Sequence, residues 1–383
     1  MSKIDTLIAD LCPDGVEYRT LNEVCKSGRK GSLKREELIT DGAYPVVNGG
    51  MGYYGRYDSF NNEGNCVVFS SRGAAGYVSY QHDPFYAAAL CYPFFSKDEN
   101  VLNARFLYFA LKTQEKENIE RLVSHGGVPA LNKEDALNIE IPVPPIEVQR
   151  EIVRILDTFT ELTETLTEEL DCRRQQYAYY RGRLLSQENL EALDGRPVEM
   201  KRMGDVCVRQ KGMPITAAKM KELASEAGDV VVFGGGKTKV LANRGELPKG
   251  NVIETPSVVV KSRGNIGFEY CDVPFTNKSE LWSYAASSSS VDIKFIYHYL
   301  ESRRAFFQDA AKVGKLPQIS TGVTDDFQVA VPSLATQRKV VDILDRFDAL
   351  TTSLTDGLPA EIEARKAQYE YYRDRLLDFP RKE

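Results

Sequence analysis

The feature that most constrains this chain is an internal repeat, because the sequence sets out nearly the same plan twice. Each copy carries a proline-containing segment, a Gln-Arg pair, an Ile-Leu-Asp-x-Phe motif and a tyrosine-rich tail. Weaker matches upstream follow in the same order, including Ser71-Arg-Gly73 with Ser262-Arg-Gly264. Repeated units of this size imply two similar domains with separate cores. The strongest pairs are Ile141-Pro-Val-Pro-Pro145 with Val329-Ala-Val-Pro-Ser333, Gln149-Arg150 with Gln337-Arg338, Ile155-Leu-Asp-Thr-Phe159 with Ile343-Leu-Asp-Arg-Phe347, and Tyr177-Ala-Tyr-Tyr-Arg181 with Tyr369-Glu-Tyr-Tyr-Arg373.

Each copy ends in a segment that predicts a long amphipathic helix. From Ile146 to Leu185 glycine occurs only at position 182 and apolar residues recur every three or four positions, close to a coiled-coil repeat. The second rod is expected from about Leu334 to Leu377, with four extra residues, Asp356-Gly-Leu-Pro359. Proline breaks helical hydrogen bonding, so we expect a kink or restart there, with Asp356 as its cap. One apolar stripe cannot stay in water, so the two rods should pair antiparallel.

The parts that precede the rods, here called heads, mix short strand-like runs with Gly/Asn turns and one helix-like stretch, which predicts an α+β fold. Two related heads on a helical spacer suit a bipartite DNA site, with the gap set by protein geometry. The expected segments are residues 1–145 (first head), 146–187 (central helix), 188–331 (second head) and 332–383 (C-terminal helix).

Composition sets further limits. The 383 residues carry a net charge of −6, so any nucleic-acid surface must be a local basic patch. No long apolar run and no signal peptide are visible, and we expect a cytoplasmic protein that contacts no membrane. Its seven cysteines should be reduced thiols that pack as small apolar residues. Their spacing contains no CxxC pair, which argues against a zinc site.

These repeated motifs make the chain similar to the DNA-specificity subunits of type I restriction–modification systems, over essentially its whole length. The resemblance implies that each head is a target-recognition domain for double-stranded DNA. It implies two modification subunits that carry S-adenosylmethionine, and restriction subunits that use ATP and Mg, with no cofactor on this chain. The first rod lacks a Gly-Leu-Pro segment, which leaves the spacing class open.

Two segments imitate catalytic motifs without completing them. Asp83-Pro-Phe-Tyr86 resembles an amino-methyltransferase loop but lacks its second proline, and Gly234-Gly-Gly-Lys237-Thr238 lacks the first glycine of a P-loop. A turn explains each segment, so the chain is expected to have no catalytic residues and no metal site.

Basic and glycine-rich segments of both heads are the candidate DNA contacts, because cations and flexible backbone suit phosphates and base edges. An exposed solvated face is the alternative for the basic segments, and an internal ion pair is the alternative for the two repeated arginines. The candidates are Lys26, Arg29, Lys30, Lys34, Asn48, Tyr53, Tyr54, Arg72 and His125 in the first head, and Arg209, Lys211, Lys237, Lys239, Arg263, Lys312 and Lys315 in the second.

The repeated rods are expected to meet two copies of one partner. Two other functions stay open at this point: a coiled-coil scaffold that reads no DNA, and the specificity subunit of a system whose single fused protein both cuts and methylates. The expected partner contacts are Gln149, Arg150, Tyr177, Tyr180, Gln337, Arg338, Tyr369 and Tyr372.

Overall fold

The structure is a computed structural model that describes residues 3–236, 238–248, 250–312, 316–352 and 357–382. The chain forms two compact units. Unit 1 joins Met1–Leu166 to Ile362–Glu383, and unit 2 is the continuous segment Thr167–Glu361. The proposed cap Asp356 and the candidate contacts Lys237 and Lys315 lie outside the described residues.

The head of unit 1 contains a four-stranded sheet in the order β2-β8-β5-β6, a three-stranded sheet β4-β3-β7, and the pair β1-β9. All pairings are antiparallel except β3 with β7. The strands are β1 Tyr18–Thr20, β2 Cys25–Ser27, β3 Tyr44–Val47, β4 Gly55–Tyr57, β5 Cys66–Ser70, β6 Val78–Gln81, β7 Tyr86–Ala87, β8 Cys91–Ser96 and β9 Glu140–Pro142. The helices are α1 Lys3–Leu11, α2 Leu21–Val24, α3 Ala104–Gln114 and α4 Lys133–Leu137, with the short turns η1 Arg35–Glu37, η2 Glu115–Ile119 and η3 Glu120–Leu122.

The head of unit 2 repeats this topology, with sheets β11-β17-β14-β15, β13-β12-β16 and β10-β18. Its one parallel pairing, β12 with β16, corresponds to β3 with β7. The strands are β10 Glu199–Arg202, β11 Cys207–Lys211, β12 Val230–Phe233, β13 Lys239–Ala242, β14 Ser257–Lys261, β15 Gly267–Cys271, β16 Phe275–Asn277, β17 Trp282–Ala286 and β18 Gln328–Val331. The helices are α6 Gln187–Asp194, α7 Met203–Val206, α8 Ala217–Glu222, α9 Ile293–Glu301, α10 Arg304–Asp309 and α11 Thr321–Asp325, with the turn η4 Arg244–Glu246.

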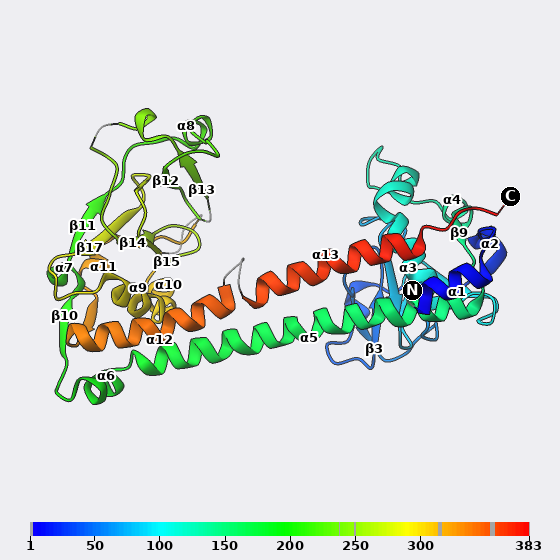
Figure 1. Cartoon of the computed structure of the whole chain (residues 1–383), viewed down its shortest axis with the longest axis horizontal. Helices are drawn as coiled ribbons and strands as arrows, with labels where there is room; N and C mark the ends of the chain where they lie inside the picture. Colours follow the sequence, from blue (N-terminus) through cyan, green and yellow to red (C-terminus); the bar gives the residue numbers. More distant parts are fainter. Residues whose placement is uncertain (1–2, 237, 249, 313–315, 353–356, 383) are drawn as a thin grey trace. The chain divides into compact units, whose positions relative to one another are not determined.

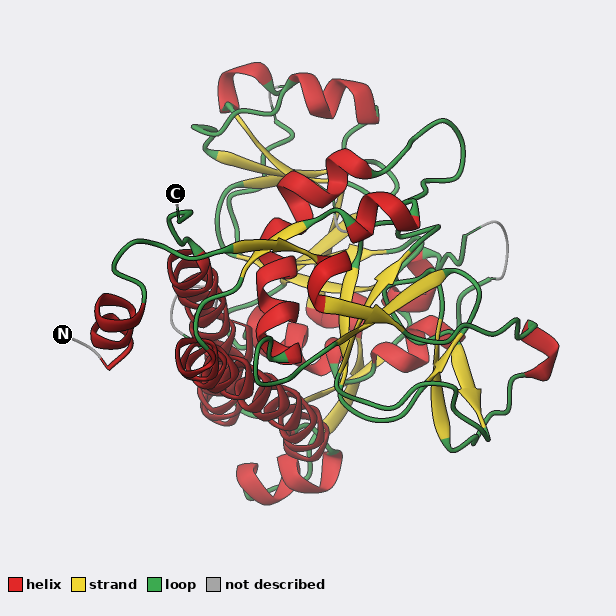
Figure 2. Cartoon of the chain, turned by 90° about the vertical axis from the view of Figure 1, so that its right-hand side faces the viewer, coloured by secondary structure: helices red, strands yellow, loops and turns green. Residues whose placement is uncertain are grey.

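The sequence pattern locates the centre of each head. Every residue of β5 (CVVFS) and of β14 (SVVVK) is buried, as expected for a central strand covered on both faces. The predicted helical stretch after each sheet is also present: α3 begins after the N-cap Asn103, and α9 begins after Asp292. Figure 2 shows short strands mixed with helices and loops, which confirms the α+β class.

The rods are α5 Ile146–Leu184, α12 Leu334–Thr352 and α13 Leu358–Leu377. In unit 1, the first part of α5 runs antiparallel to α13 (Figure 1), and the rings of Phe159 and Tyr372 stack 5.4 Å apart. In unit 2, the end of α5 runs antiparallel to α12 (Figure 1), and Tyr180 stacks on Phe347 at 5.9 Å. The two ring pairs occupy matching positions of the sequence repeat, so the seam confirms the predicted antiparallel pairing within each unit.

Two details of the rods correct or refine the sequence prediction. The second rod is divided, as expected, and Pro359 lies in the first turn of α13, where its missing N–H is not needed. The seam, however, is not buried throughout, because the equivalent leucines Leu162 and Leu350 are exposed. The cysteines are free and buried except Cys172, which is exposed on α5.

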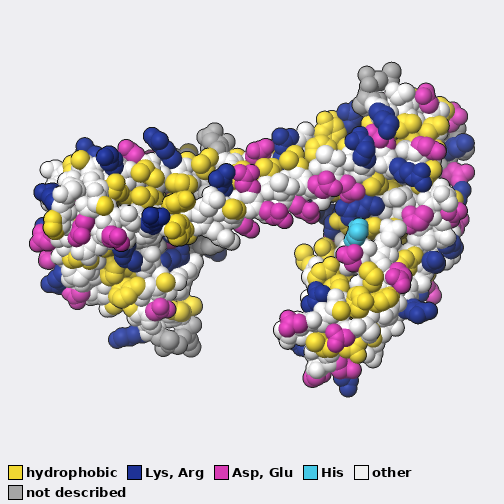
Figure 3. Space-filling model, turned by 90° about the horizontal axis from the view of Figure 1, so that it is seen from below, with side chains coloured by type: hydrophobic (Ala, Val, Ile, Leu, Met, Phe, Trp, Pro, Cys, Tyr) yellow, Lys and Arg dark blue, Asp and Glu magenta, His cyan; other side chains and the backbone are white. Residues whose placement is uncertain are grey.

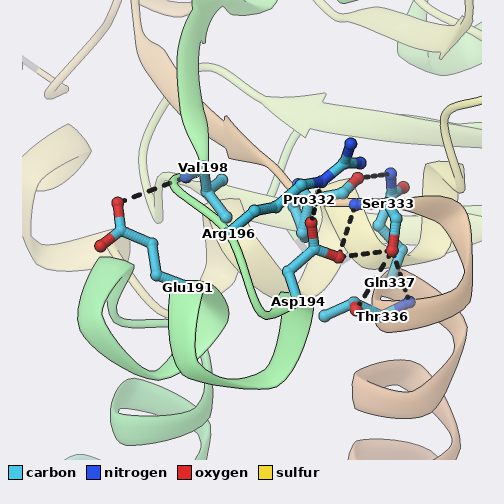
Figure 4. Close-up of polar contacts among 8 residues, drawn as sticks. All are labelled: Glu191, Asp194, Arg196, Val198, Pro332, Ser333, Thr336 and Gln337. Atoms are coloured by element: carbon cyan, nitrogen blue, oxygen red, sulfur yellow. Dashed lines mark hydrogen bonds and ion pairs between the residues drawn. The ribbon is translucent and has the colours of Figure 1, made fainter.

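The two heads close onto their rods differently. In unit 1 the backbone of Val16 bonds to Pro380 and Lys382, so the C-terminal tail lies beside the first strand. In unit 2 the corresponding segment is continuous with the rod, because α6 follows α5 directly and leads into β10. Figure 4 shows Asp194 at the end of α6 bonded to Ser333, at the start of α12, and to Arg196. Those partners, Arg196 first and Ser333 next, hold the pKa of Asp194 well below its usual range.

Candidate nucleic-acid interface

The basic segment that follows β2 stands on a fixed backbone. The buried side chain of Asn62 accepts a hydrogen bond from the Arg29 N–H and donates one to the Arg29 carbonyl, both at 2.8 Å. A side chain at Gly28 would collide with Asn62, so glycine is required there. Lys26, Arg29 and Lys34 are exposed and make no ion pair to the described residues. The loop therefore presents cations that stay available to an anionic partner.

Lys30 differs from its neighbours in the same segment. Its ammonium lies 4.6 Å from the centre of the Tyr92 ring, and burial lowers its pKa. A lysine held against an aromatic face has less freedom to reach a phosphate. Lys30 is still exposed, so among the predicted cations of this segment it is the one whose ammonium also packs against an aromatic ring.

A hollow of about 780 Å³ in the first head gathers four of the predicted DNA contacts. Asn48, Tyr53, Tyr54 and Arg72 all line it, together with Arg35 of the basic segment that follows β2. Aromatic and amide edges beside cations are suited to bases and phosphates. The sequence had placed these residues in three separate segments, and the fold brings them together.

Two glycines let those segments meet. A Cβ at Gly49 would collide with the carbonyl of Arg72, and Gly73 has a φ of +80°, where side chains are disfavoured. The Ala74 N–H donates to the Gly49 carbonyl at 2.8 Å, and the Asn48 Oδ1 accepts from the Leu90 N–H at 2.9 Å. Asn48 thus uses its side-chain oxygen to hold the loop, and its amide N–H groups make no hydrogen bond to the described residues.

Arg72 and Arg263 occupy equivalent turns in the two heads. Gly264 after Arg263 has a φ of +78°, close to that of Gly73, and the preceding serines accept backbone bonds from Leu131 and Ile319. Both arginines are exposed, and neither makes an ion pair to the described residues. The internal ion pair considered from the sequence is therefore not what the fold contains.

Two predicted cations of the second head form ion pairs within the head. Arg209 lies 3.4 Å from Asp325, and Lys239 lies 3.1 Å from Glu269, a carboxylate that it shares with Lys261. Lys211 and Lys312 are exposed. In the first head, His125 is exposed and lies 3.4 Å from Glu120. Figure 3 shows cationic and anionic side chains interspersed on the visible face, so a DNA surface has to be a local feature.

The sequence patterns did not single out Lys261, a buried lysine of the second head. The ammonium of Lys261 lies 3.4 Å from Glu269 and 4.5 Å from the centre of the Phe233 ring. Burial lowers its pKa. Its equivalent in the first head is Ser70, at the end of β5, so only the second head has this internal pair. The run Ser257-Val-Val-Val-Lys261 carried a signal, since a lysine that ends a fully buried strand needs a partner.

The expected partner contacts divide by exposure. Gln149 and Gln337 are each 0 % exposed and bond within their own unit, so their side chains lie inside the units rather than on the surface. Arg150 and Arg338, the next residues, are exposed. The helical period explains this, since adjacent residues point about 100° apart.

The tyrosine tails divide in the same way. Tyr177 and Tyr369 pack inside the units, and burial raises the pKa of each to about 12. Tyr180 and Tyr372 stack on the seam phenylalanines. The residues of these tails that face outward most are the equivalent Tyr179 and Tyr371, 62 % and 59 % exposed. Their positions off the apolar seam were the signal that could have identified them.

Comparison with known proteins identifies the family. The model described as "Type I restriction modification DNA specificity domain" matches residues 13–171 and again residues 196–364. The chain belongs to this family. The two matches coincide with the internal repeat, and they identify the chain as a specificity subunit, the non-catalytic component of a type I restriction-modification complex.

Relatives and solved structures agree with this assignment. The specificity subunit of the type I enzyme EcoR124I/EcoR124II of Escherichia coli is 33 % identical over 75 % of this chain and 74 % of its own length. The crystal structure of the type I S subunit from M. genitalium superposes with a TM-score of 0.63 at 22 % identity, covering 95 % of this chain and 96 % of that one. A chain from a study of type I complex assembly and conformational transition superposes at 0.55, with 16 % identity and coverage of 96 % and 98 %. These neighbours have the same fold.

The specificity subunit has few features that suggest other chemistry. Within the described ranges, no group of three or more His, Cys, Asp or Glu side chains is placed to hold a metal ion. The same ranges contain no helix long and apolar enough to span a bilayer.

Proposed function

We propose that this specificity subunit reads a bipartite double-stranded DNA site, with one half for each target-recognition domain, residues 1–145 and 188–331. The observation that carries the proposal is the pair of exposed arginines, Arg72 and Arg263, which two equivalent glycine turns present in heads whose other surfaces differ.

The repeat divides the DNA contacts into two kinds. A residue retained in both heads suits what both half-sites share, which is the phosphate backbone. Arg72 and Arg263 would then bind phosphates. Asn48, Tyr53 and Tyr54 line a hollow of the first head, the glycine-rich segment at the same place in the second head (residues 234–238) carries neither asparagine nor tyrosine, and the three side chains would read bases. The exposed cations Lys26, Arg29 and Lys34 would add phosphate contacts in the first head.

The subunit would hold two copies of one modification subunit, each at an equivalent patch. In unit 2 the patch contains Tyr179 and Tyr180, whose rings meet edge to face at 5.3 Å. In unit 1 it contains Tyr371 and Tyr372, at 5.4 Å. Exposed tyrosines on a rigid helix are typical of protein interfaces. S-adenosylmethionine, ATP and Mg would be bound by the modification and restriction subunits, in the cytoplasm where the DNA is.

Methylome mapping tests the proposal. A split motif should be methylated in cells that carry the gene and unmethylated after its deletion, and Arg72→Ala should reduce methylation without changing the motif. A motif that survives deletion contradicts DNA reading and favours the scaffold alternative. The alternative of a fused restriction–methylation enzyme is tested by pull-down, which should recover two separate polypeptides rather than one.

A further inference from the structure

The joint between head and rod is built from the same contacts in both units. In unit 1 it consists of Asn103 and Arg105 of the head with Gln149 and Asp157 of α5. In unit 2 it consists of Asp292 and Lys294 with Gln337 and Asp345 of α12. We call these two sets the head–rod joints. Each lies entirely within one unit.

The first grip of each joint is a buried glutamine. In unit 1 the Gln149 Oε1 accepts from the Asn103 N–H at 2.9 Å, and its Nε2 donates to the carbonyls of Val101 and Pro144 at 2.8 and 2.7 Å. The amide therefore uses three of its four hydrogen-bonding positions to join the head's loop to the start of the rod.

In unit 2 the Gln337 side chain makes the equivalent bonds. Its Oε1 accepts from the Asp292 N–H at 2.7 Å, and its Nε2 donates to the carbonyls of Ser290 and Pro332 at 3.0 and 2.8 Å. Because the backbone N–H that each glutamine holds belongs to the N-cap residue of α3 or α9, the grip fixes the beginning of the head's helix.

The second grip is an ion pair about two helical turns farther along the rod. Arg105 lies 2.8 Å from Asp157, and Lys294 lies 2.7 Å from Asp345. At 1.5 Å per residue, the glutamine and the aspartate of each rod are about 12 Å apart along the helix axis. Apolar residues of each rod already belong to the core of its head, such as Ile152 in unit 1 and Val340 in unit 2. The two separated polar grips add directional contacts that set the angle between the head's helix and the rod.

The cation of the second grip also contacts the central sheet. The guanidinium of Arg105 lies 4.8 Å from the centre of the Tyr80 ring on β6, and the ammonium of Lys294 lies 5.1 Å from that of Tyr270 on β15. Tyr80 and Tyr270 are equivalent, since they pair with the same position of β5 and β14. Sheet, head helix and rod therefore meet at one charged side chain.

We propose that Asp157 and Asp345 are positioning residues that fix the direction of each head on its rod, and through it the gap between half-sites that the complex accepts. This inference rests on the proposed bipartite reading, because a gap has meaning only if both heads read DNA.

The test uses the complete complex with its modification subunits. Methyl transfer is measured on duplexes with the native gap and with the gap one base pair longer or shorter, the half-sites being unchanged. We expect Asp157→Asn and Asp345→Asn each to reduce the preference for the native gap by about tenfold, the size of losing one charge-assisted hydrogen bond. Rejection of a base change within a half-site should stay as in the wild type, and Asp157→Glu should restore the gap preference.

The matched control is Glu161→Gln, which removes one exposed carboxylate a turn farther along α5 and should leave the gap preference unchanged. Aspartate variants that melt at the wild-type temperature and keep the wild-type gap preference overturn the proposal. If one variant does not fold, the other, in the other unit, carries the test. A wild-type complex that ignores both half-sites contradicts the bipartite function itself, which distinguishes the two failures.

Discussion

The two heads share a frame but differ in how they handle charge. The first head presents Lys26, Arg29 and Lys34 without ion pairs to the described residues, whereas the second ties Arg209 to Asp325 and Lys239 to Glu269. What both heads keep is the head–rod joint and one exposed arginine in a glycine turn. The two copies have therefore retained the residues that orient a head on its rod and the arginine proposed to bind the DNA backbone, while the surfaces around them have diverged.

The largest expected effect tests the shared frame. Gln149→Leu and Gln337→Leu each leave buried backbone groups without the hydrogen bond that the glutamine amide had made. Each should lower the free energy of unfolding by about 3 kcal/mol. The chain has one tryptophan, and Trp282 is buried in unit 2. Urea unfolding followed by its fluorescence should therefore shift for Gln337→Leu and stay unchanged for Gln149→Leu. Equal shifts for both variants would show that the two units do not unfold separately.

A second prediction separates the joints by pH. His298 lies buried 3.2 Å from Asp345, with Lys294 and Arg181 also near, and Phe109 holds its place in the first copy. Burial lowers the pKa of His298 to about 4, and its Nδ1 has no partner. Below about pH 6.5 His298 binds a proton in the unfolded chain but stays neutral in the folded one. The free energy of unfolding of unit 2 should therefore fall by about 2 kcal/mol by pH 5.

The matched variant for this prediction is His298→Phe, which installs the first copy's residue. It should remove the histidine's share of the pH dependence, because no group is left there to titrate, and should leave stability at pH 7 equal or higher. Urea unfolding by Trp282 fluorescence at pH 7 and pH 5 measures both. A wild-type chain with equal stability at the two values contradicts a buried neutral histidine.

The third prediction concerns the shared arginines. Arg72→Ala and Arg263→Ala should each weaken DNA binding about tenfold, on cognate and unrelated duplexes alike, and each should reduce the slope of log K against log salt by about 1. Fluorescence anisotropy over a salt series measures both quantities. A loss confined to one half-site sequence would reassign that arginine from phosphate to base contact.

The smallest expected effect contrasts free and paired cations. Arg29→Ala should weaken binding about threefold and lower the salt slope, because an unpaired charge is lost. Arg209→Ala should leave the slope nearly unchanged, because Asp325 already neutralises that charge. The same anisotropy series decides this. Equal slopes for both variants would mean that the ion pair opens when DNA binds.

The architecture could be predicted from the sequence because the architecture depends on local patterns. A short, mostly apolar run predicted each of β5 and β14, three-and-four spacing predicted the rods, and Pro359 marked the division of the second rod. The joints were out of reach, because Arg105 and Asp157 are far apart in the chain and only packing brings them together. A glutamine repeated in both copies looks the same in the sequence whether it contacts a partner or holds a loop, so the burial of Gln149 could not be predicted. The outward direction of Tyr179 could be predicted, since its helical position lies off the seam.

The tail beside Val16 has a consequence for how the protein is made. Leu376, Leu377 and Phe379 belong to the same apolar core as Ile4 and Val16. On the ribosome, domains generally fold as they emerge. Unit 2 is one continuous segment and can complete its core during synthesis. The first head must wait, with part of its core uncovered, until the last residues of unit 1 have been added. The part of the protein made first is thus finished last, and its exposure to chaperones and proteases is set by the time taken to translate the other half.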